Sequence, residues 1–431
     1  MNEKHFNHKI VFVLLAVMML SGCSSGSPTA SPTPVASSRL IPSGTHTVAL
    51  TTTPSPTIPT PTFTPSATPL PSQTLTMTLI PGLTIQCVEI SAEVPLPSVT
   101  NSGVVLMTPL DSAPYLLNLS TSTRYSIPLT HPDIHSVDSG EVSPDGNSLA
   151  YIERFDNQES ERIIGLLRIV TADGQIKAIN NFEKYWTWWR WLDNDRLEIY
   201  WWDAPNPGTV ILMNPFTGQR VDLTPTFPNL YNDTFNPAVW RVIYSPDLER
   251  VLYLSNADQY LGKAVLWDIV TGNTVWQYSE AGVGTISQIP AWSPLGDQVA
   301  VVVGNHLFRV NYSGLATQLP DIGQNEVGRF TWSPDGHHIA FWASSHHGKT
   351  RNLFILDTIS NQVVDLCLDT ASAEGNPPLW SPDGLQFIFR RAVENVDGSL
   401  RDEAILVDID KGIANLIPND EVPTAWMRSM P

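Results

Sequence analysis

Four histidines in two adjacent pairs, His337-His338 and His346-His347, come closest to the types and spacing of a metal-binding set. Imidazole is the commonest transition-metal ligand in proteins and titrates near neutral pH. A metal site would need the four rings to converge, but His337 and His338 should point to opposite faces of a strand. We therefore expect solvated turn residues here rather than a metal site.

An acidic segment, Asn395-Val396-Asp397-Gly398 followed by Asp402 and Glu403, offers the oxygen ligands that calcium prefers. It lacks the alternating series of ligands that a calcium-binding loop carries. We expect the tip of a solvated hairpin instead, and we predict neither a metal nor a cofactor for the chain.

Catalytic signatures are absent from residues 83–431, which contain no GxSxG elbow, P-loop, GxGxxG fingerprint or HExxH motif. Apart from Cys23, two cysteines remain in the chain, too few for a thiolate zinc site of the usual kind. Three residues follow Arg428, which leaves no room for a hydrolase domain. We therefore predict that the protein is not an enzyme.

The most unusual composition is the aromatic stretch YWTWWRWLDNDRLEIYWW, from Tyr185 to Trp202. Exposed aromatic rings could stack on sugars or anchor a protein partner. These residues alternate on strands, however, so core packing is the expectation for most of them, namely Trp186, Trp188, Trp189, Trp191 and Trp201. Trp202, at a strand end, is the better surface candidate.

A repeated turn motif sets the positions of all these residues. Its best copies are Ser143-Pro144-Asp145-Gly146, Ser333-Pro334-Asp335-Gly336 and Ser381-Pro382-Asp383-Gly384, and worn copies start at Ser245 and Ser293. Proline presets φ at the second turn position, aspartate suits the third, and glycine tolerates the geometry that closes the turn. The motif is therefore predicted to be a structural turn between two strands.

The copies recur with a regular period. Counting a degenerate copy at Leu192, they start at residues 143, 192, 245, 293, 333 and 381, which are spaced by 40 to 53 residues. An apolar strand begins near six residues after each serine, and a second turn follows 21 to 31 residues after the same serine. Each repeat thus contains four strands, and this period predicts a β-propeller.

The ends of this region supply one more blade. Before the first motif, three strands are expected at Val104–Met107, Tyr115–Leu119 and Tyr125–Leu129, and Pro423–Met427 resembles an inner strand. Joining them gives an all-β, seven-bladed propeller over residues 83–431, closed by the C-terminal strand in the first blade. Six or eight blades are the alternatives.

The string WSPDGxxIAF at Trp332, followed by a VxDxxTG-like strand, resembles the PD40 (WD40-like) repeat of TolB-like propellers. The resemblance covers about residues 100 to 428 and implies architecture rather than activity. Relatives in this family include an envelope component that carries an α/β domain and peptidases that carry a hydrolase domain. This chain departs from both, because a signal and a linker precede its repeats.

The N-terminus resembles a bacterial lipoprotein signal. Lys4 and Lys9 precede a short apolar run, and Leu20-Ser21-Gly22-Cys23 has the pattern of a lipobox. We predict a signal peptide over residues 1–22 and lipidation of Cys23, which would anchor the protein to the bacterial cell membrane, outside the cytoplasm. An ordinary signal peptide with a chance cysteine is the alternative.

Residues 23–82 contain mostly Ser, Thr, Pro and Ala after the cysteine, with Arg39 as their single charged residue. Too few large apolar groups are present to offset the entropy of ordering, so we predict a disordered stalk. Extended polyproline II segments of this length could reach up to about 180 Å. A flexible leader without a spacing role is the alternative.

Cys87 and Cys367 remain once Cys23 is lipidated. Disulfides persist outside the cytoplasm, so one bridge is possible and would tie the start of the folded region to its body. Two independent buried thiols are the alternative, and the sequence does not decide between them.

The formal net charge of −18 argues against nucleic acid as a partner. Long connections between strands are where binding usually resides, and the candidate binding residues on them are Trp202, Tyr231, Asp233, Phe235 and Tyr260. We predict a monomeric, non-catalytic module that binds envelope proteins or polymers. Binding or processing of carbohydrate is the alternative.

Overall fold

A computed structural model describes residues 87–96, 103–108, 113–129, 134–137, 140–157, 162–182, 187–201, 209–223, 238–258, 261–281, 289–304, 306–320, 322, 326–344, 350–371, 377–418 and 423–428. All of them belong to the unit Thr76–Pro431. Within these ranges, no helix has the length and apolar character needed to cross a membrane.

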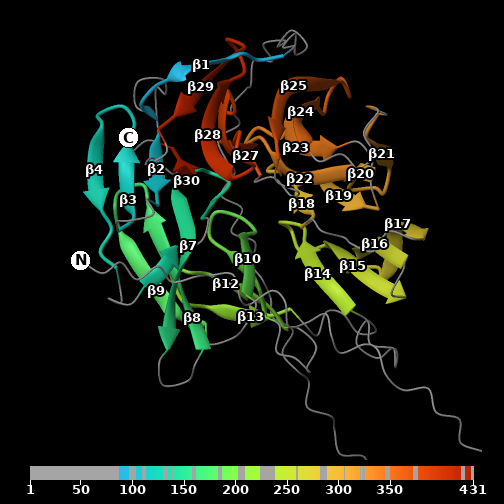
Figure 1. Cartoon of the computed structure of the whole chain (residues 1–431). Helices are drawn as coiled ribbons and strands as arrows, with labels where there is room; N and C mark the ends of the chain where they lie inside the picture. The colour runs from blue at the N-terminus through green and yellow to red at the C-terminus, as the bar shows by residue number, and fades with distance from the viewer. Residues whose placement is uncertain are drawn as a thin grey trace, which may run out of the picture. The chain divides into compact units, whose positions relative to one another are not determined.

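Seven β-sheets form the blades of a ring in the described ranges (Figure 1). Four blades run in chain order from the inner to the outer strand. Blade 3 contains β10 (Thr187–Trp191), β11 (Leu197–Trp201), β12 (Thr209–Met213) and β13 (Arg220–Asp222), and blade 4 contains β14 (Ala238–Tyr244), β15 (Arg250–Asp258), β16 (Leu261–Asp268) and β17 (Asn273–Ala281). Blade 5 contains β18 (Ala291–Trp292), β19 (Gln298–Val303), β20 (His306–Asn311) and β21 (Ala316–Gln318), and blade 6 contains β22 (Glu326–Trp332), β23 (His338–Ser344), β24 (Arg351–Asp357) and β25 (Val363–Thr370).

The other three blades depart from this order. Blade 2 has two short inner strands, β5 (Ile134–Val137) and β6 (Glu141–Val142), which both pair with β7 (Ser148–Asn157), followed by β8 (Arg162–Thr171) and β9 (Ile176–Phe182). Blade 7 contains β26 (Leu379–Trp380), β27 (Gln386–Glu394), β28 (Leu400–Asp408) and β29 (Ile413–Ile417), with β1 (Ile90–Glu93) added in parallel to β29. Blade 1 contains β30 (Pro423–Met427), β2 (Val104–Met107), β3 (Tyr115–Asn118) and β4 (Thr123–Ser126).

Blade 1 closes the ring as the sequence predicts, and the prediction of seven blades is confirmed. The C-terminal strand β30 pairs antiparallel with β2, with Val104 opposite Met427 and Val105 opposite Trp426. Gly103, just before β2, has a φ of +107°, and a Cβ there would lie 2.4 Å from the Trp426 indole nitrogen. The outer strand β4 begins at Thr123, two residues before the expected Tyr125, and ends at Ser126 rather than Leu129.

The repeated turn motif works through its serine and aspartate side chains. Ser333 Oγ donates a hydrogen bond to Asp335 Oδ1 at 2.5 Å and accepts one from the His338 amide at 2.9 Å. Asp335 Oδ1 also accepts the His337 amide, and the Gly336 amide donates to the Ser333 carbonyl oxygen. Ser333 is fully buried, so these bonds supply the partners that its hydroxyl needs away from water.

The imperfect copies of the motif, which start at Ser245 and Ser293, form the same turn with different residues. Leu295 stands where the other copies have aspartate, and Ser293 Oγ donates instead to Asp297 Oδ1 at 2.5 Å. Leu248 stands where the others have glycine and still holds a φ of +64°, in the left-handed region that most residues avoid. The turn geometry is therefore fixed by its surroundings even where the sequence departs from the motif.

Tryptophans at the ends of the inner strands bond adjacent blades together. Each lies just before the first position of the motif, which is a serine in two cases and Leu192 in the third, and its indole N–H donates to the residue two before that position in the preceding blade. The three bonds are Trp191 to Glu141 O (3.0 Å), Trp332 to Ala291 O (3.0 Å) and Trp380 to Thr331 Oγ1 (3.1 Å). At these three positions, the tryptophan thus bonds neighbouring blades together.

Ser333→Ala should lower the free energy of unfolding by about 1–3 kcal/mol, because it removes a buried hydroxyl and leaves the His338 amide without that acceptor. Ser313→Ala is the matched control, since the Ser313 hydroxyl is exposed and bonds Asn311 within its own turn. Chemical denaturation measures both variants. Equal losses in the two would contradict the role assigned to the motif.

Candidate functional site

The binding residues predicted on the connections lie outside the described ranges of the chain, and so does the lipidation site. This applies to Trp202, Tyr231, Asp233, Phe235 and Tyr260, and to Cys23. Their roles stay predictions. Within the aromatic stretch, Trp189 and Trp191 are 8% and 6% exposed, which confirms core packing for these two rings.

The histidines divide into two environments. His337 is half-buried beside Asp335, whereas His338 is buried, with its ring 6.3 Å from that of Trp380 in the next blade. The expectation of a solvated turn was therefore wrong for His338, and burial lowers its pKa. His346 and His347 lie outside the described residues, and no group of three or more His, Cys, Asp or Glu within the described ranges could hold a metal ion.

The acidic tip between β27 and β28 turns its aspartate onto its own hairpin. Asp397 Oδ1 accepts hydrogen bonds from the amide and the hydroxyl of Ser399 at 2.9 and 2.6 Å, and these bonds lower the pKa of Asp397. Val396 beside it is fully exposed. The tip is solvated, as the sequence indicates, but the expectation was wrong for Glu403, which is 6% exposed and bonds Arg391 on the neighbouring strand at 2.9 Å.

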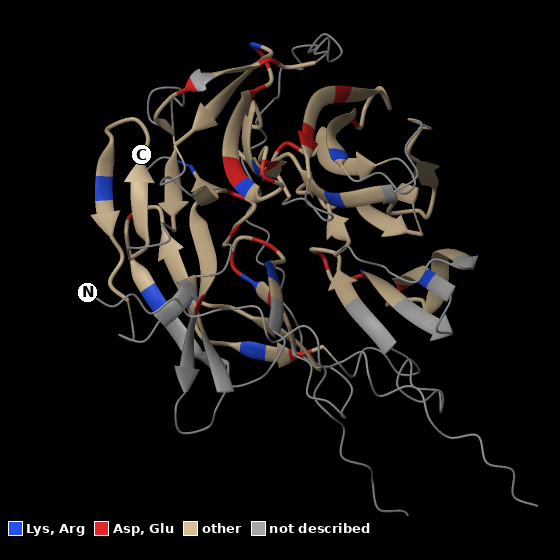
Figure 2. Ribbon diagram, viewed as in Figure 1, with Lys and Arg blue, Asp and Glu red and all other residues tan. Residues whose placement is uncertain are grey.

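The inner strands of the ring line an open central cavity of about 560 Å³. Blades 2, 3, 5, 6 and 7 contribute its lining, which includes Glu141, Arg190, Arg329, Thr331 and four tryptophans. A second cavity of about 190 Å³, at the end of the inner strands that carries the turn motifs, shares Val142, Trp332, Leu379 and Trp380 with the first. The two cavities therefore adjoin, and we call them together the channel. Figure 2 shows charges of both signs around the middle of the ring.

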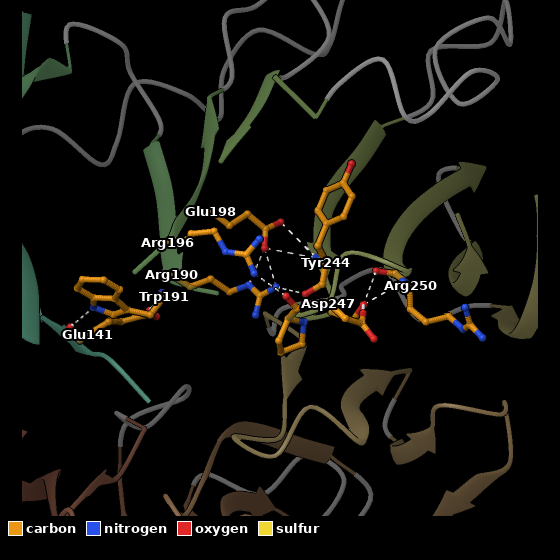
Figure 3. Close-up of polar contacts among 10 residues, drawn as sticks. Glu141, Arg190, Trp191, Arg196, Glu198, Tyr244, Asp247 and Arg250 are labelled. Carbon is orange, nitrogen blue, oxygen red and sulfur yellow. Dashed lines mark hydrogen bonds and ion pairs between the residues drawn. The ribbon is translucent and has the colours of Figure 1, made fainter. Parts of the chain in front are cut away.

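A buried ion pair lies at one side of the channel, where Arg190 is part of the lining (Figure 3). Arg190, on β10, places Nη2 and Nε at 2.6 and 2.8 Å from Oε2 of Glu198, on β11. Arg190 Nη2 also donates to the Tyr244 carbonyl oxygen, and Glu198 accepts the Tyr244 amide at 3.3 Å. Burial raises the pKa of Glu198, and the Arg190 charge opposes that rise. The pair therefore supplies hydrogen-bond partners to the edge of β14 that faces away from β15.

Glu141, on β6, has the same role at the preceding junction, between blades 2 and 3. Its Oε2 accepts the Trp191 amide at 3.3 Å, while its carbonyl oxygen accepts the Trp191 indole. The side chain is exposed, but toward the lumen of the channel, where the ring surrounds it. This enclosure raises the pKa of Glu141 from its usual value near 4.5 to about 7, and the nearby Arg190 charge partly opposes the rise.

The opposite wall carries Arg329 of blade 6 among mainly apolar residues. Blades 5 and 7 contribute Ile289, Pro290, Pro377, Pro378 and Leu379 there. Thr331 Oγ1 donates to the Pro378 carbonyl oxygen at 2.9 Å and accepts the Trp380 indole, so its hydroxyl is occupied by the blade junction. A ligand in the channel would therefore meet Glu141 and Arg190 on one side, and prolines together with Arg329 on the other.

Reasoning from the sequence missed this site because it assigned binding to the long connections. A signal was nevertheless present. The residue two before the serine is charged in two copies, as Glu141 and Arg190, whereas blades 4, 5 and 7 have Ile243, Ala291 and Leu379 there. A charged residue at this position of an otherwise apolar inner strand is the signal that could have identified these two lining residues.

Comparisons with known proteins support the fold alone. No family model matches the chain, and no curated protein matches it. Among solved structures, TolB from Acinetobacter baumannii is 16% identical, with 75% of this chain and 82% of that chain covered and a TM-score of 0.40. A structure from a study of two prolyl endopeptidases is 11% identical, with 74% and 48% covered and a TM-score of 0.50. An oligogalacturonate lyase in complex with manganese is 12% identical, with 73% and 85% covered and a TM-score of 0.46. At these identities the chain is similar to them as a β-propeller and no further.

The raised pKa of Glu141 should make stability depend on pH. Its carboxyl titrates near 4.5 in the unfolded chain and near 7 in the ring, so its contribution to stability is complete below pH 4.5 and is lost as the pH rises through 7. Between pH 4 and pH 8, the stability of Glu141→Gln relative to wild type should therefore rise. We expect a change on the order of 1 kcal/mol, because channel water screens the charge.

Urea denaturation at the two pH values measures this change, and Glu394→Gln, at an exposed position of the β27–β28 hairpin, is the control. The pKa assigned to Glu141 is wrong if both variants follow wild type across this range.

Proposed function

We propose that the protein is a lipid-anchored, extracytoplasmic β-propeller that binds a partner in its central channel without catalysing a reaction. The observation that carries this proposal is the channel lining, with Glu141 and Arg190 on one wall and prolines together with Arg329 on the other. A rigid, concave site with a few fixed polar groups is the usual form of a binding site. The proposal includes membership of the TolB-like, PD40-containing propellers, which rests on the repeat.

A role in binding rather than catalysis is supported by what the polar side chains of the channel contact. Arg190 and Glu198 bond each other and the backbone of Tyr244, and Thr331 bonds Pro378 and Trp380. Groups held in this way can orient a ligand. They are poorly placed to move during a reaction, because each displacement would open a junction between blades.

An extracytoplasmic location is supported by two independent features. Cys23 follows a lipobox-like sequence, and Cys87 is joined to Cys367 by a disulfide, which persists in oxidising compartments. Neither feature depends on the channel.

A protein segment or an envelope polymer is the favoured ligand. Carbohydrate is the second candidate because four tryptophans line the cavity. They are 6–8% exposed, however, so they present little of their ring faces for a sugar to stack on.

Photocrosslinking tests the site. A photoreactive amino acid at Ala291, which lines the cavity, should capture a partner from a bacterial envelope extract, whereas the same residue at exposed Ser313 should not. Mass spectrometry and glycan staining then identify the adduct as protein or polysaccharide. Identical adducts at both positions, or none at Ala291, would count against the channel as the site.

Lipid anchoring has a separate test. Cys23→Ser should abolish incorporation of radiolabelled palmitate and move the protein from the membrane fraction to the soluble fraction, because the acyl chains attach through this sulfur. Ser24→Ala, which keeps the cysteine, is the control. A Cys23→Ser protein that still carries palmitate refutes the assigned lipidation site.

A further inference from the structure

Residues 87–96 cross the outer strands of blades 6 and 7 and end between blades 7 and 1. The Val88 amide donates to the Leu366 carbonyl oxygen in β25 of blade 6 at 3.0 Å, and β1 then pairs with β29 of blade 7 (Figure 1). Leu96 is fully buried among side chains of blades 1 and 7. We call this segment the strap.

The pairing of the strap with blade 7 is short. β1 contributes four residues, Ser91 Oγ adds a hydrogen bond to the Ala414 carbonyl oxygen, and the Val94 amide donates to the Leu416 carbonyl oxygen at 2.9 Å. A pull on the chain upstream of the strap would load these bonds one after another, starting at their N-terminal end. Hydrogen bonds loaded in succession give way at low force, since each must resist the pull alone.

A disulfide stands at the upstream end of the strap. Cys87 is bonded to Cys367, which lies 280 residues away on β25, and their Cα atoms are 4.6 Å apart. Leu366 and Leu368 flank Cys367 and are buried, so β25 is held by the core on both sides of the bridge. A pull on the upstream chain therefore reaches a covalent bond before it reaches β1.

The backbone at both half-cystines is strained. Cys87 has a φ of +41° and Cys367 a φ of +55°, in the left-handed region that residues with a side chain rarely adopt. Strain of this kind persists where the surroundings fix it, and it often marks a functional feature. Neither cysteine is buried, so filling the core does not account for their positions.

We propose that the strap and its disulfide form a tension clamp, which transfers a pull on the upstream chain to β25 and keeps β1 on the edge of blade 7. The inference rests on the proposed anchoring for its biological meaning, because a tethered ring is the case in which the upstream chain carries load. Without the clamp, such a load would strip β1 from β29 and uncover a strand edge, which is a site for unwanted pairing.

Single-molecule force measurements on the full chain test the clamp. Enzymatic tags attach the handles at Gly82, upstream of the strap, and at Asp410, in the exposed turn of blade 7 beside the N-terminal end of β1, so that the pull peels β1 from β29. In the Cys87→Ser, Cys367→Ser double variant we expect an early low-force event that releases the strap, with a gain in length of roughly 35 Å for ten extended residues. The oxidised wild-type chain should lack this event.

Leu96→Ala is the matched variant, because it removes a fully buried contact of the strap but leaves the disulfide intact. Hydrogen exchange at the Val88 and Val94 amides should become at least tenfold faster both in this variant and in the double variant, whereas the early force event should be confined to the double variant. Identical force records for wild type and the double variant would overturn the proposal. So would a loss of protection in the double variant that spreads to the inner strands, since the disulfide would then hold the whole ring.

These measurements use purified protein without lipid, so they do not depend on Cys23. If palmitate labelling failed while the force records agreed, the clamp would stand and the proposed anchoring would not. If the force records failed, the anchoring would be unaffected.

Discussion

An inner strand has a strand partner on one side, and the backbone groups on its other edge need hydrogen bonds from elsewhere. At two junctions of this ring those bonds come from a charged side chain of the preceding blade. Glu141 accepts a hydrogen bond from the Trp191 amide. Glu198 accepts one from the Tyr244 amide, and Arg190 donates one to the Tyr244 carbonyl oxygen. The same contacts hold adjacent blades together and form the channel wall. The blades and the candidate site therefore depend on one set of bonds.

Much of the fold could be predicted from the sequence because its determinants are local. The serine, aspartate and glycine of each turn contact one another within a few residues, as Ser333, Asp335 and Gly336 do, so their spacing alone identifies the turn. Closure was predictable for a related reason. Strands β2 to β4 lacked an inner partner, and Pro423–Met427 was a strand without a sheet.

The site was less predictable because its residues come together only when the ring closes. Glu141 and Arg190 belong to different repeats, and neither lies in a sequence motif with a known chemical role. His338 shows the same limit: its local sequence is typical of a turn, yet Trp380 from the next blade covers it. Contacts across blade junctions depend on how neighbouring strands are placed, which periodicity alone does not give.

The charges in the channel are more than the fold requires. Leaving a buried partner such as Glu198 without its counterion costs about 3–5 kcal/mol, whereas replacing a whole pair with apolar residues is often neutral. Blades 4, 5 and 7 show the apolar solution at the same position, with Ile243, Ala291 and Leu379. Assembly of the ring could therefore use apolar residues at this position, although in this chain Glu141 and the Arg190–Glu198 pair also bond the adjacent blade. The proposed recognition of a ligand with complementary polar groups would account for the choice of charged residues, so the proposal rests on these charges rather than on the size of the cavity.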